Sequence, residues 1–107
     1  MPDTSLQGGE NTGGTMSELS ETVEITNQRG LHARASAKFV NAVAKLPDGV
    51  AVRVAKDGHD AAGGSILGLM MLGAARGDSI EIFCSGTEAE AALLKLVGLV
   101  KDGFGED

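Results

Sequence analysis

The chain has 107 residues and a formal net charge of −6, so its length and charge fit a single acidic domain. It holds three aromatic residues, all phenylalanine, and no basic stripe, which argues against nucleic-acid binding. No stretch approaches the roughly 20 apolar residues that span a bilayer, and no basic region followed by an apolar run marks a secretory signal. The chain is therefore expected in the cytoplasm and away from membranes.

The cysteine content fits the same compartment. Cys84 is the single cysteine and has no partner for an internal disulfide, as is usual in a reducing cytoplasm. The sequence contains no cysteine and histidine spacing of the kind that binds zinc. We therefore expect no metal ion and no cofactor, and we expect Cys84 to be a buried apolar residue.

The two ends of the chain lack the patterns of folded elements. Residues 1–17 are rich in glycine, serine and threonine and have no periodicity, so they are predicted to be a disordered tail. Met16, close to the end of this tail, is a candidate for the true start. Residues 104–107 are predicted to be an acidic C-terminal tail, with Gly105, Glu106 and Asp107 solvated, which leaves residues 18–103 as one domain.

Strands are predicted where apolar and polar residues alternate. The first covers residues 21–27, and the second covers residues 50–55, with valine at every other position from its start. Asp57-Gly58 is typical of a two-residue hairpin turn, so a third strand should return over about 59–63. A fourth strand follows at 80–84.

Helices are predicted where apolar residues recur at helical spacing. The first covers residues 33–45. Its apolar stripe is expected to be Ala37, Val40 and Ala44, flanked by Phe39 and Val43. A short second helix covers residues 65–72, with Ser65 as its N-cap. A third helix opens with a capping box of Thr87 and Glu90.

The resulting element order is β-α-β-β-α-β-α. Strands that pair antiparallel, with helices gathered on one face, form an α+β fold. The expected architecture is an open-faced two-layer sandwich, in which three helices cover one face of a four-stranded antiparallel sheet. A fold class of this kind does not by itself determine a function.

Chemical character is concentrated in the segment Gly30-Leu31-His32-Ala33-Arg34, where a loop meets the first predicted helix. The first backbone N–H groups of a helix have no partner within the helix, and the helix dipole is positive there. His32 should therefore be neutral near pH 7 and present a nucleophilic ring nitrogen. A phosphoryl group on that nitrogen would be held by the backbone around Gly30 and Ala33 and by the guanidinium of Arg34.

Two interpretations of this segment stay open at this point. In the simpler one, His32 only caps the helix and Arg34 is a solvated charge, and spacing alone does not exclude this. In the other, His32 is a nucleophile with an anion cradle. The sequence contains no nearby acid–base pair, metal cluster or Walker-type glycine loop, so such a nucleophile would work together with the site of another protein.

From about residue 19 to residue 103 the sequence resembles the HPr family, the histidine phosphocarriers of the bacterial phosphoenolpyruvate-dependent sugar phosphotransferase system. The resemblance rests on Gly30–Arg34, on the segment Gly64–Gly73 and on the order of the elements. It implies the sandwich fold described above and a carrier rather than a free-standing enzyme. It also implies that His32 is phosphorylated on Nδ1 and that Arg34 is the active-site arginine.

The resemblance also implies partners. Enzyme I, charged from phosphoenolpyruvate, would be the phosphoryl donor, and IIA proteins or domains would be the acceptors. No long apolar patch or heptad run suggests assembly, so a monomer is expected. The family commonly has proline where this chain has Ala35, and this difference should alter rigidity rather than function.

Ser65 matches the family's regulatory serine, which a dedicated HPr kinase/phosphorylase modifies in some bacteria. An N-cap role and a regulatory role are compatible. A phosphate at a helix N-terminus would be tolerated by the fold. It would also place negative charge on the surface that meets enzyme I, and so should weaken that docking.

The second predicted helix has more apolar residues than one core-facing stripe needs. The residues expected to face the core are Ile66, Leu69 and Leu72 or Gly73. Leu67, Met70 and Met71 are then candidates for an exposed docking surface beside His32. The alternative for these residues, above all for Met71, is that they fill the core.

Three other functions compete with that of a sugar-system phosphocarrier. A paralogue of a nitrogen-type or regulatory branch would still use His32 but would meet different partners. A small regulatory binding module would need no phosphorylation, and glutamine could then replace His32 without loss. An enzyme proper, such as a small phosphatase or kinase fragment, would need a general base, metal site or nucleotide loop that the sequence lacks.

Overall fold

The computed structural model describes residues 18–106, so the predicted tail at residues 1–17, the candidate start at Met16 and residue 107 lie outside this range. The helices and strands, in chain order, are β2 (Glu18–Glu24), α1 (Ala33–Ala44), β3 (Val50–Lys56), β4 (His59–Ala62), α2 (Ile66–Met71), β5 (Ser79–Gly86) and α3 (Ala89–Lys101). A short 3-10 helix, η1 (Gly103–Gly105), follows α3. No helix within residues 18–106 is both long enough and apolar enough to cross a membrane.

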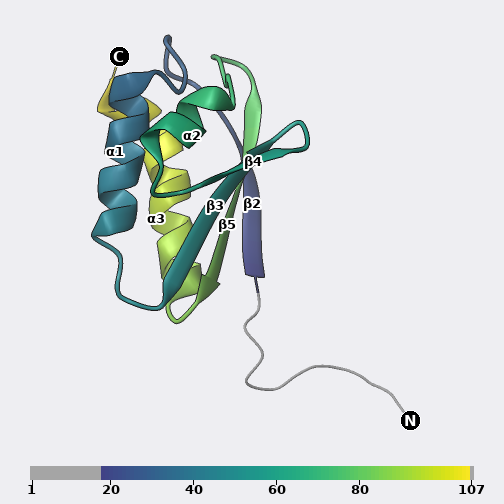
Figure 1. The fold of residues 1–107 in the computed structure, drawn as a ribbon. Helices are drawn as coiled ribbons and strands as arrows, with labels where there is room; N and C mark the ends of the chain where they lie inside the picture. Colours follow the sequence, from purple (N-terminus) through teal and green to yellow (C-terminus); the bar gives the residue numbers. More distant parts are fainter. Residues whose placement is uncertain (1–17, 107) are drawn as a thin grey trace.

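The four strands form one antiparallel sheet in the order β2-β5-β3-β4. Figure 1 shows α1, α2 and α3 together on one face of this sheet, while the other face is uncovered. α3 packs against β2 and β5, and α2 packs against α1 and β4. The predicted open-faced sandwich and its element order are therefore confirmed.

The first strand is displaced from its predicted position at residues 21–27. Glu24 pairs with Ser79, which is the first residue of β5, so the ladder has no further partner beyond this point. The N–H of Ile25 donates instead to the carbonyl of Asp78 at 2.8 Å, and the chain turns away from the sheet. The predicted alternation is nevertheless correct, because Val23 and Ile25 are both buried.

The fourth predicted strand has its inward face as expected. Ile80, Ile82 and Cys84 are buried under the helices, and each is at most 1% exposed. Desolvation raises the pKa of the Cys84 thiol, so this cysteine behaves as a small apolar core residue, as predicted.

The buried face of α1 differs from the predicted stripe. Ala35, Ser36 and Phe39 are buried, whereas Ala44 is exposed and Ala37 and Val40 are half-buried. The face was misplaced because a serine belongs to it. The Ser36 hydroxyl donates to the carbonyl of Leu31 at 3.2 Å, and this hydrogen bond allows a polar residue to occupy the core side of the helix.

The start of α3 also differs from the prediction. Its N-cap residue is Glu88, which has a left-handed backbone with φ 63° and makes no side-chain capping hydrogen bond. Thr87 therefore lies one residue outside the helix, and the predicted capping box of Thr87 and Glu90 does not form. The reason is the tight turn after β5, where Gly86 also has a positive φ.

The N-terminus of α2 is capped as predicted, but one core assignment there is wrong. The Ser65 Oγ accepts a hydrogen bond from the N–H of Gly68 at 2.9 Å. Leu69 is fully buried, whereas Ile66 is 41% exposed and does not face the core. A helix of six residues has fewer than two turns. It therefore buries one residue fully and leaves most of its apolar neighbours on the surface.

Candidate functional site

His32 lies at the N-terminus of α1, as the sequence predicts. Its backbone is extended, and its carbonyl accepts a hydrogen bond from the N–H of Ser36 at 2.9 Å. Its ring nitrogen Nδ1 accepts a longer hydrogen bond, 3.4 Å, from the backbone N–H of Arg34. The side chain is 17% exposed. The ring is therefore oriented by the first turn of the helix while part of it stays open to solvent.

The loop before His32 is held in place by backbone contacts. The Asn27 amide donates to the carbonyl of Gly30 at 2.8 Å, and the N–H of Leu31 donates to the carbonyl of Ala74 at 2.9 Å. Gly30 has φ 63°, and a Cβ at this position would collide with the carbonyl oxygen of Ala74. Glycine is therefore required at position 30 because the backbone there lies close to the chain segment after α2.

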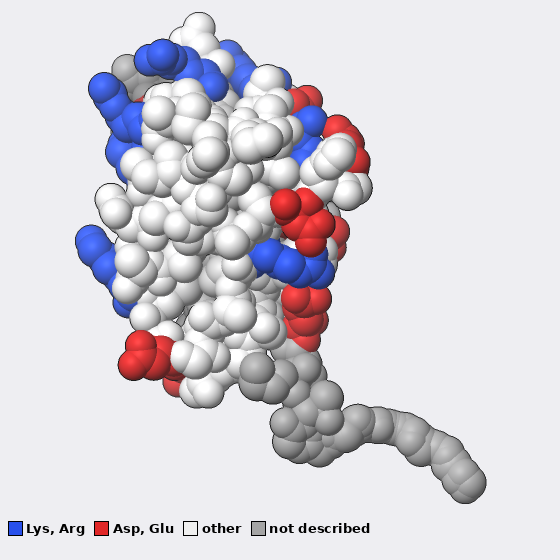
Figure 2. Space-filling view, viewed as in Figure 1, with Lys and Arg blue, Asp and Glu red and all other residues white. Residues whose placement is uncertain are grey.

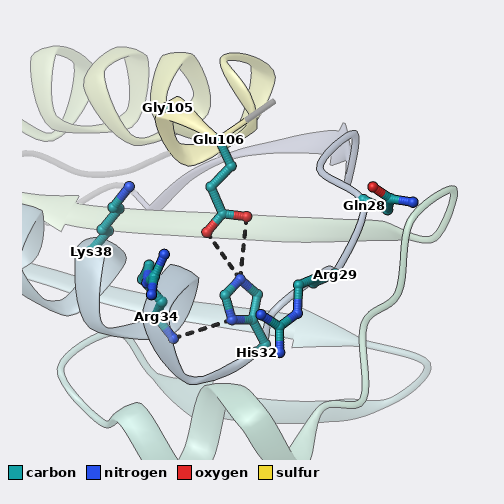
Figure 3. A pocket seen from close by; sticks show the side chains of 7 residues that line it. All are labelled: Gln28, Arg29, His32, Arg34, Lys38, Gly105 and Glu106. Carbon is teal, nitrogen blue, oxygen red and sulfur yellow. Dashed lines mark hydrogen bonds and ion pairs between the residues drawn. The ribbon is translucent and has the colours of Figure 1, made fainter.

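The other ring nitrogen of His32 contacts a carboxylate. Nε2 lies 2.9 Å from Oε2 and 3.2 Å from Oε1 of Glu106 (Figure 3). A carboxylate only accepts hydrogen bonds, so Nε2 carries a proton in this contact. Since Nδ1 accepts from Arg34, the two contacts together favour the tautomer with the proton on Nε2 and a lone pair on Nδ1.

The position of Glu106 corrects the prediction of a solvated acidic tail, as far as residue 106. Phe104 is 1% exposed and packs in the core, and the Lys38 ammonium donates to its carbonyl at 2.7 Å. Gly103, Phe104 and Gly105 all have positive φ, so the chain coils back over the start of α1. The sequence does contain an indication of this fold, which is Phe104 between Gly103 and Gly105. A tail that lies entirely in solvent needs neither an aromatic residue nor flanking glycines.

An open pocket surrounds the ring. Its lining residues are Gln28, Arg29, His32, Arg34, Lys38, Gly105 and Glu106 (Figure 3). In this view Arg29 and Arg34 lie on either side of His32. The pocket thus gathers three basic side chains, Arg29, Arg34 and Lys38, in a chain whose net charge is −6. Figure 2 shows basic side chains gathered at the end of the molecule where α1 begins, with acidic ones at the opposite end and beside the sheet.

The carboxylate of Glu106 is held in its charged form. Desolvation alone would raise the pKa of Glu106, but hydrogen bonds from Asn27 and His32 and the nearby Lys38 charge lower it by more. The net pKa therefore lies below the ordinary value. Of the residues that complete this pocket, sequence reasoning found His32 and Arg34 and missed Arg29, Lys38 and Glu106.

The remaining predicted site residues lie on α2 and at the start of α1. Ala33 is the first residue of α1, and Ser65 is the N-cap of α2. Four exposed apolar side chains of α2 form what we call the α2 patch. They are Ile66 (41% exposed), Leu67 (67%), Met70 (39%) and Met71 (77%). Because α2 packs against α1, the patch belongs to the same helical layer as His32. The three predicted docking residues are therefore on the surface, and the core alternative for Met71 is wrong.

This arrangement suits the transient binding of a phosphoryl group. It combines a nitrogen lone pair, a helix N-terminus and cationic side chains, which are the groups that bind phosphate oxygens in proteins. Within residues 18–106 there is no group of three or more histidine, cysteine, aspartate or glutamate side chains that could hold a metal ion.

Known proteins are similar in sequence to this chain over nearly all of its folded region. The family model described as the PTS HPr component phosphorylation site matches residues 19–102. Phosphocarrier protein HPr of Neisseria meningitidis is 41% identical over 88 residues, which cover 82% of this chain and 97% of that protein. Phosphocarrier protein NPr of Escherichia coli K12 is 36% identical over 89 residues, which cover 83% of this chain and 98% of that protein.

Solved structures agree with the fold. HPr-C-His from Thermoanaerobacter tengcongensis superimposes with a TM-score of 0.77 at 36% identity, and the match covers 83% of this chain and 98% of that one. HPr from Bacillus anthracis gives a TM-score of 0.73 at 31% identity, with coverage of 78% and 98%. The fold and these likenesses define a phosphocarrier protein rather than a free-standing enzyme. The chain belongs to the HPr family of the phosphotransferase system, and its relatives include both HPr and NPr proteins.

Proposed function

We propose that this chain is a cytoplasmic phosphocarrier that accepts a phosphoryl group from phospho-enzyme I on Nδ1 of His32 and passes it to IIA proteins. The observation that carries the proposal is the pair of contacts on the His32 ring. Glu106 accepts the proton of Nε2, and the N–H of Arg34 points at the lone pair of Nδ1. The nitrogen with the lone pair is the one that lies at the helix N-terminus.

The proposed transfer is a simple displacement at phosphorus. The Nδ1 lone pair of His32 forms the new bond to phosphorus, while the bond from phosphorus to the donor breaks and its electron pair leaves with the donor. The added negative charge then lies at the start of α1, next to the backbone around Ala33 and the guanidinium of Arg34. Arg29 and Lys38 line the same pocket and add positive charge. The reverse displacement delivers the group to an acceptor.

The α2 patch is the proposed docking surface for enzyme I and for the acceptors. Flexible methionine side chains can adapt to several partners, and a cluster of exposed apolar residues is unusual unless a partner covers it. Ser65 begins the same helix, so a phosphate added to its Oγ by an HPr kinase/phosphorylase would place charge at the edge of this surface. We propose that such a modification weakens docking without altering His32.

A second candidate is a carrier of the nitrogen-type branch. The 36% identity to NPr of Escherichia coli over nearly the whole of that protein supports this alternative beside the 41% identity to HPr of Neisseria meningitidis. Both alternatives use His32, and they differ in the donor and acceptors that recognise the surface.

The test is a mass measurement with two donors. Wild type and His32→Gln are incubated with phosphoenolpyruvate, Mg²⁺ and either sugar-system or nitrogen-type enzyme I, and the intact mass is recorded. We expect one acid-labile phosphoryl adduct on the wild type and none on the variant. The enzyme I that phosphorylates the chain faster when both are used at the same low concentration assigns the chain to the sugar or the nitrogen-type branch. Absence of the adduct with both donors, in the presence of a working HPr control, would contradict the proposed function.

A further inference from the structure

The contact between Glu106 and His32 lies on the ring edge opposite the nitrogen that is proposed to react. The two residues are 74 positions apart, and the carboxylate reaches Nε2 at 2.9 Å. We infer that Glu106 is a positioning residue for phosphoryl transfer, because it keeps a proton on Nε2 and stabilises the positive ring that forms when Nδ1 is phosphorylated. This inference rests on the proposed function and assigns a role to a residue that the sequence placed in a solvated tail.

The carboxylate is itself held by a buried amide. Asn27 is 1% exposed, and its Nδ2 donates both to the carbonyl of Gly30 and to Oε1 of Glu106, at 2.8 and 3.2 Å. Its Oδ1 has no hydrogen-bond partner among the described residues. An unsatisfied buried oxygen is costly, so this amide is poorly explained by stability alone. Both of its hydrogen bonds go to groups that orient His32.

The backbone that carries Glu106 is also fixed. Phe104 has φ 59°, which is uncommon and costly for a bulky residue, yet its side chain is fully buried. Lys38, from α1, donates to the Phe104 carbonyl at 2.7 Å. A side chain in the core and a clamp from the helix of His32 therefore hold the chain two residues before Glu106. The carboxylate is therefore presented by a turn that is anchored to the core and to α1.

The chemistry of the transfer gives this contact its role. In the tautomer that these contacts favour, the ring carries a single proton, on Nε2. When the Nδ1 lone pair bonds to phosphorus and the donor leaves with its electron pair, the ring still holds the Nε2 proton and so becomes positively charged. A carboxylate that accepts this proton's hydrogen bond is more favourable after the bond forms than before, which lowers the barrier. In the reverse step the ring leaves as a neutral group, which also requires the proton on Nε2.

The geometry of the pocket also explains why an acidic residue, Glu106, lies among basic side chains. Arg29, Arg34 and Lys38 suit the phosphoryl oxygens, and a carboxylate close to those oxygens would repel them. Glu106 instead contacts Nε2, on the far side of the ring from Nδ1 (Figure 3). The cations and the carboxylate therefore serve two different charges of one intermediate, the phosphoryl group and the ring.

Three variants separate orientation from charge. Glu106→Ala removes both the acceptor and the charge, whereas Glu106→Gln keeps an oxygen that can accept from Nε2. Glu90→Ala is the matched control, because it removes one exposed acidic side chain from the first turn of α3, at the end of that helix away from the site. Phosphoramidate serves as the phosphoryl donor. It needs no docking surface, and ammonia leaves as its phosphorus–nitrogen bond breaks.

Two readouts are taken on each protein. The first is the ¹H–¹⁵N NMR signal of the His32 Nε2–H, which solvent exchange should broaden when no acceptor holds the proton. The second is the rate constant of phosphorylation by phosphoramidate, followed by intact mass. For Glu106→Ala we expect loss of the Nε2–H signal and a rate about tenfold lower, since hydrogen bonds to charged groups are among the stronger ones and partial exposure weakens this one. Glu106→Gln should keep the signal and lose only part of the rate.

Three outcomes of these variants would contradict the inference. Glu106→Ala with an unchanged signal would show that the contact does not hold the proton, and Glu106→Ala with an unchanged rate would show that it does not assist transfer. Equal loss of rate in Glu90→Ala would assign the effect to net charge. Failure of the wild type to react with enzyme I, with phosphoramidate labelling intact, would instead contradict the proposed function and leave the inference about Glu106 standing.

Discussion

The helices α1 and α2 both begin with a side-chain N-cap, but the surroundings of the two caps differ. Each is capped by a side chain that can carry a phosphoryl group, His32 for α1 and Ser65 for α2. The Ser65 cap is local and short, 2.9 Å to the N–H of Gly68. The His32 cap is longer, 3.4 Å to the N–H of Arg34, and its ring also contacts a carboxylate 74 residues away. The Ser65 side chain therefore has only a capping contact, whereas the His32 ring is oriented by contacts on both of its nitrogens, as the proposed transfer requires.

The residues around the two caps also differ in chemical character. The pocket around His32 contains Arg29, Arg34 and Lys38, which suit an anion. The short helix α2 carries exposed apolar side chains, which suit a protein surface. Under the proposed function, a phosphate at the first site would be bound by its surroundings, whereas a phosphate at the second would mainly change which proteins can dock. One helical layer thus combines a proposed transfer site with a proposed recognition site.

The largest expected effect comes from breaking the long-range support of the first site. Phe104→Ala removes a fully buried aromatic side chain, so the free energy of unfolding should fall by about 3–5 kcal/mol. It should also release Glu106 from His32, and with it the Nε2–H signal, while the Ser65 cap stays intact. Urea unfolding and NMR at low temperature measure both. The control is Phe83→Ala, which removes a half-buried phenylalanine below the Arg53 guanidinium and should leave the His32 signal unchanged.

A second change strains the loop before His32 where it contacts the segment after α2. Gly30→Ala places a Cβ against the carbonyl of Ala74 and forces a left-handed backbone on alanine, which should cost about 1–3 kcal/mol of stability. Because Leu31 bonds the same carbonyl, the position of His32 should shift and phosphorylation by phosphoramidate should slow. Gly58→Ala has the same backbone cost but meets no neighbouring atom within 4 Å, so it should spare the rate. Equal rates in both variants would contradict the role given to Gly30.

A third pair of changes tests the second site alone. Ser65→Ala removes the N-cap of α2 and should lower the unfolding free energy by about 1 kcal/mol, without changing labelling by phosphoramidate. Ser65→Asp keeps a capping oxygen and adds charge beside the α2 patch, so its stability should be close to that of the wild type. It should raise the concentration of enzyme I needed for half-maximal phosphorylation. An enzyme I dependence equal to that of Ser65→Ala would argue against control of docking by charge at this position.

The sequence predicts the local features of both caps, but not the long-range contacts around His32. Local patterns were enough for the strand alternation, the Ser65 cap and the junction at His32, because each depends on residues within a few positions. Glu106 and Lys38 were missed because their roles depend on how the chain end folds back over α1, and this is a tertiary contact. The composition of residues 104–107 suggests solvent, and only the buried Phe104 between two glycines indicates otherwise.

Errors within single elements have related causes. The stripe of α1 was misplaced because buried Ser36 does not count as apolar, although its hydroxyl is satisfied by the carbonyl of Leu31. The capping box at Thr87 fits the sequence rule, but the turn after β5 needs a left-handed residue at Glu88. In both cases a favourable local pattern yielded to the geometry of a neighbouring segment.

The smallest expected effect is a pH dependence that again distinguishes the two caps. The groups that face Glu106 are Asn27, His32 and Lys38, and they place its pKa in the folded protein below the ordinary value. A lowered folded pKa contributes stability that is complete above the unfolded carboxyl value of about 4.3 and is lost as the pH falls through the folded pKa. The urea midpoint of the wild type should therefore exceed that of Glu106→Gln near neutral pH, and the difference should shrink in acid. The difference between wild type and Ser65→Ala should stay constant over the same range, because a hydroxyl cap does not titrate there. A Glu106→Gln difference equally independent of pH would mean that the carboxylate gains nothing from its contacts around His32.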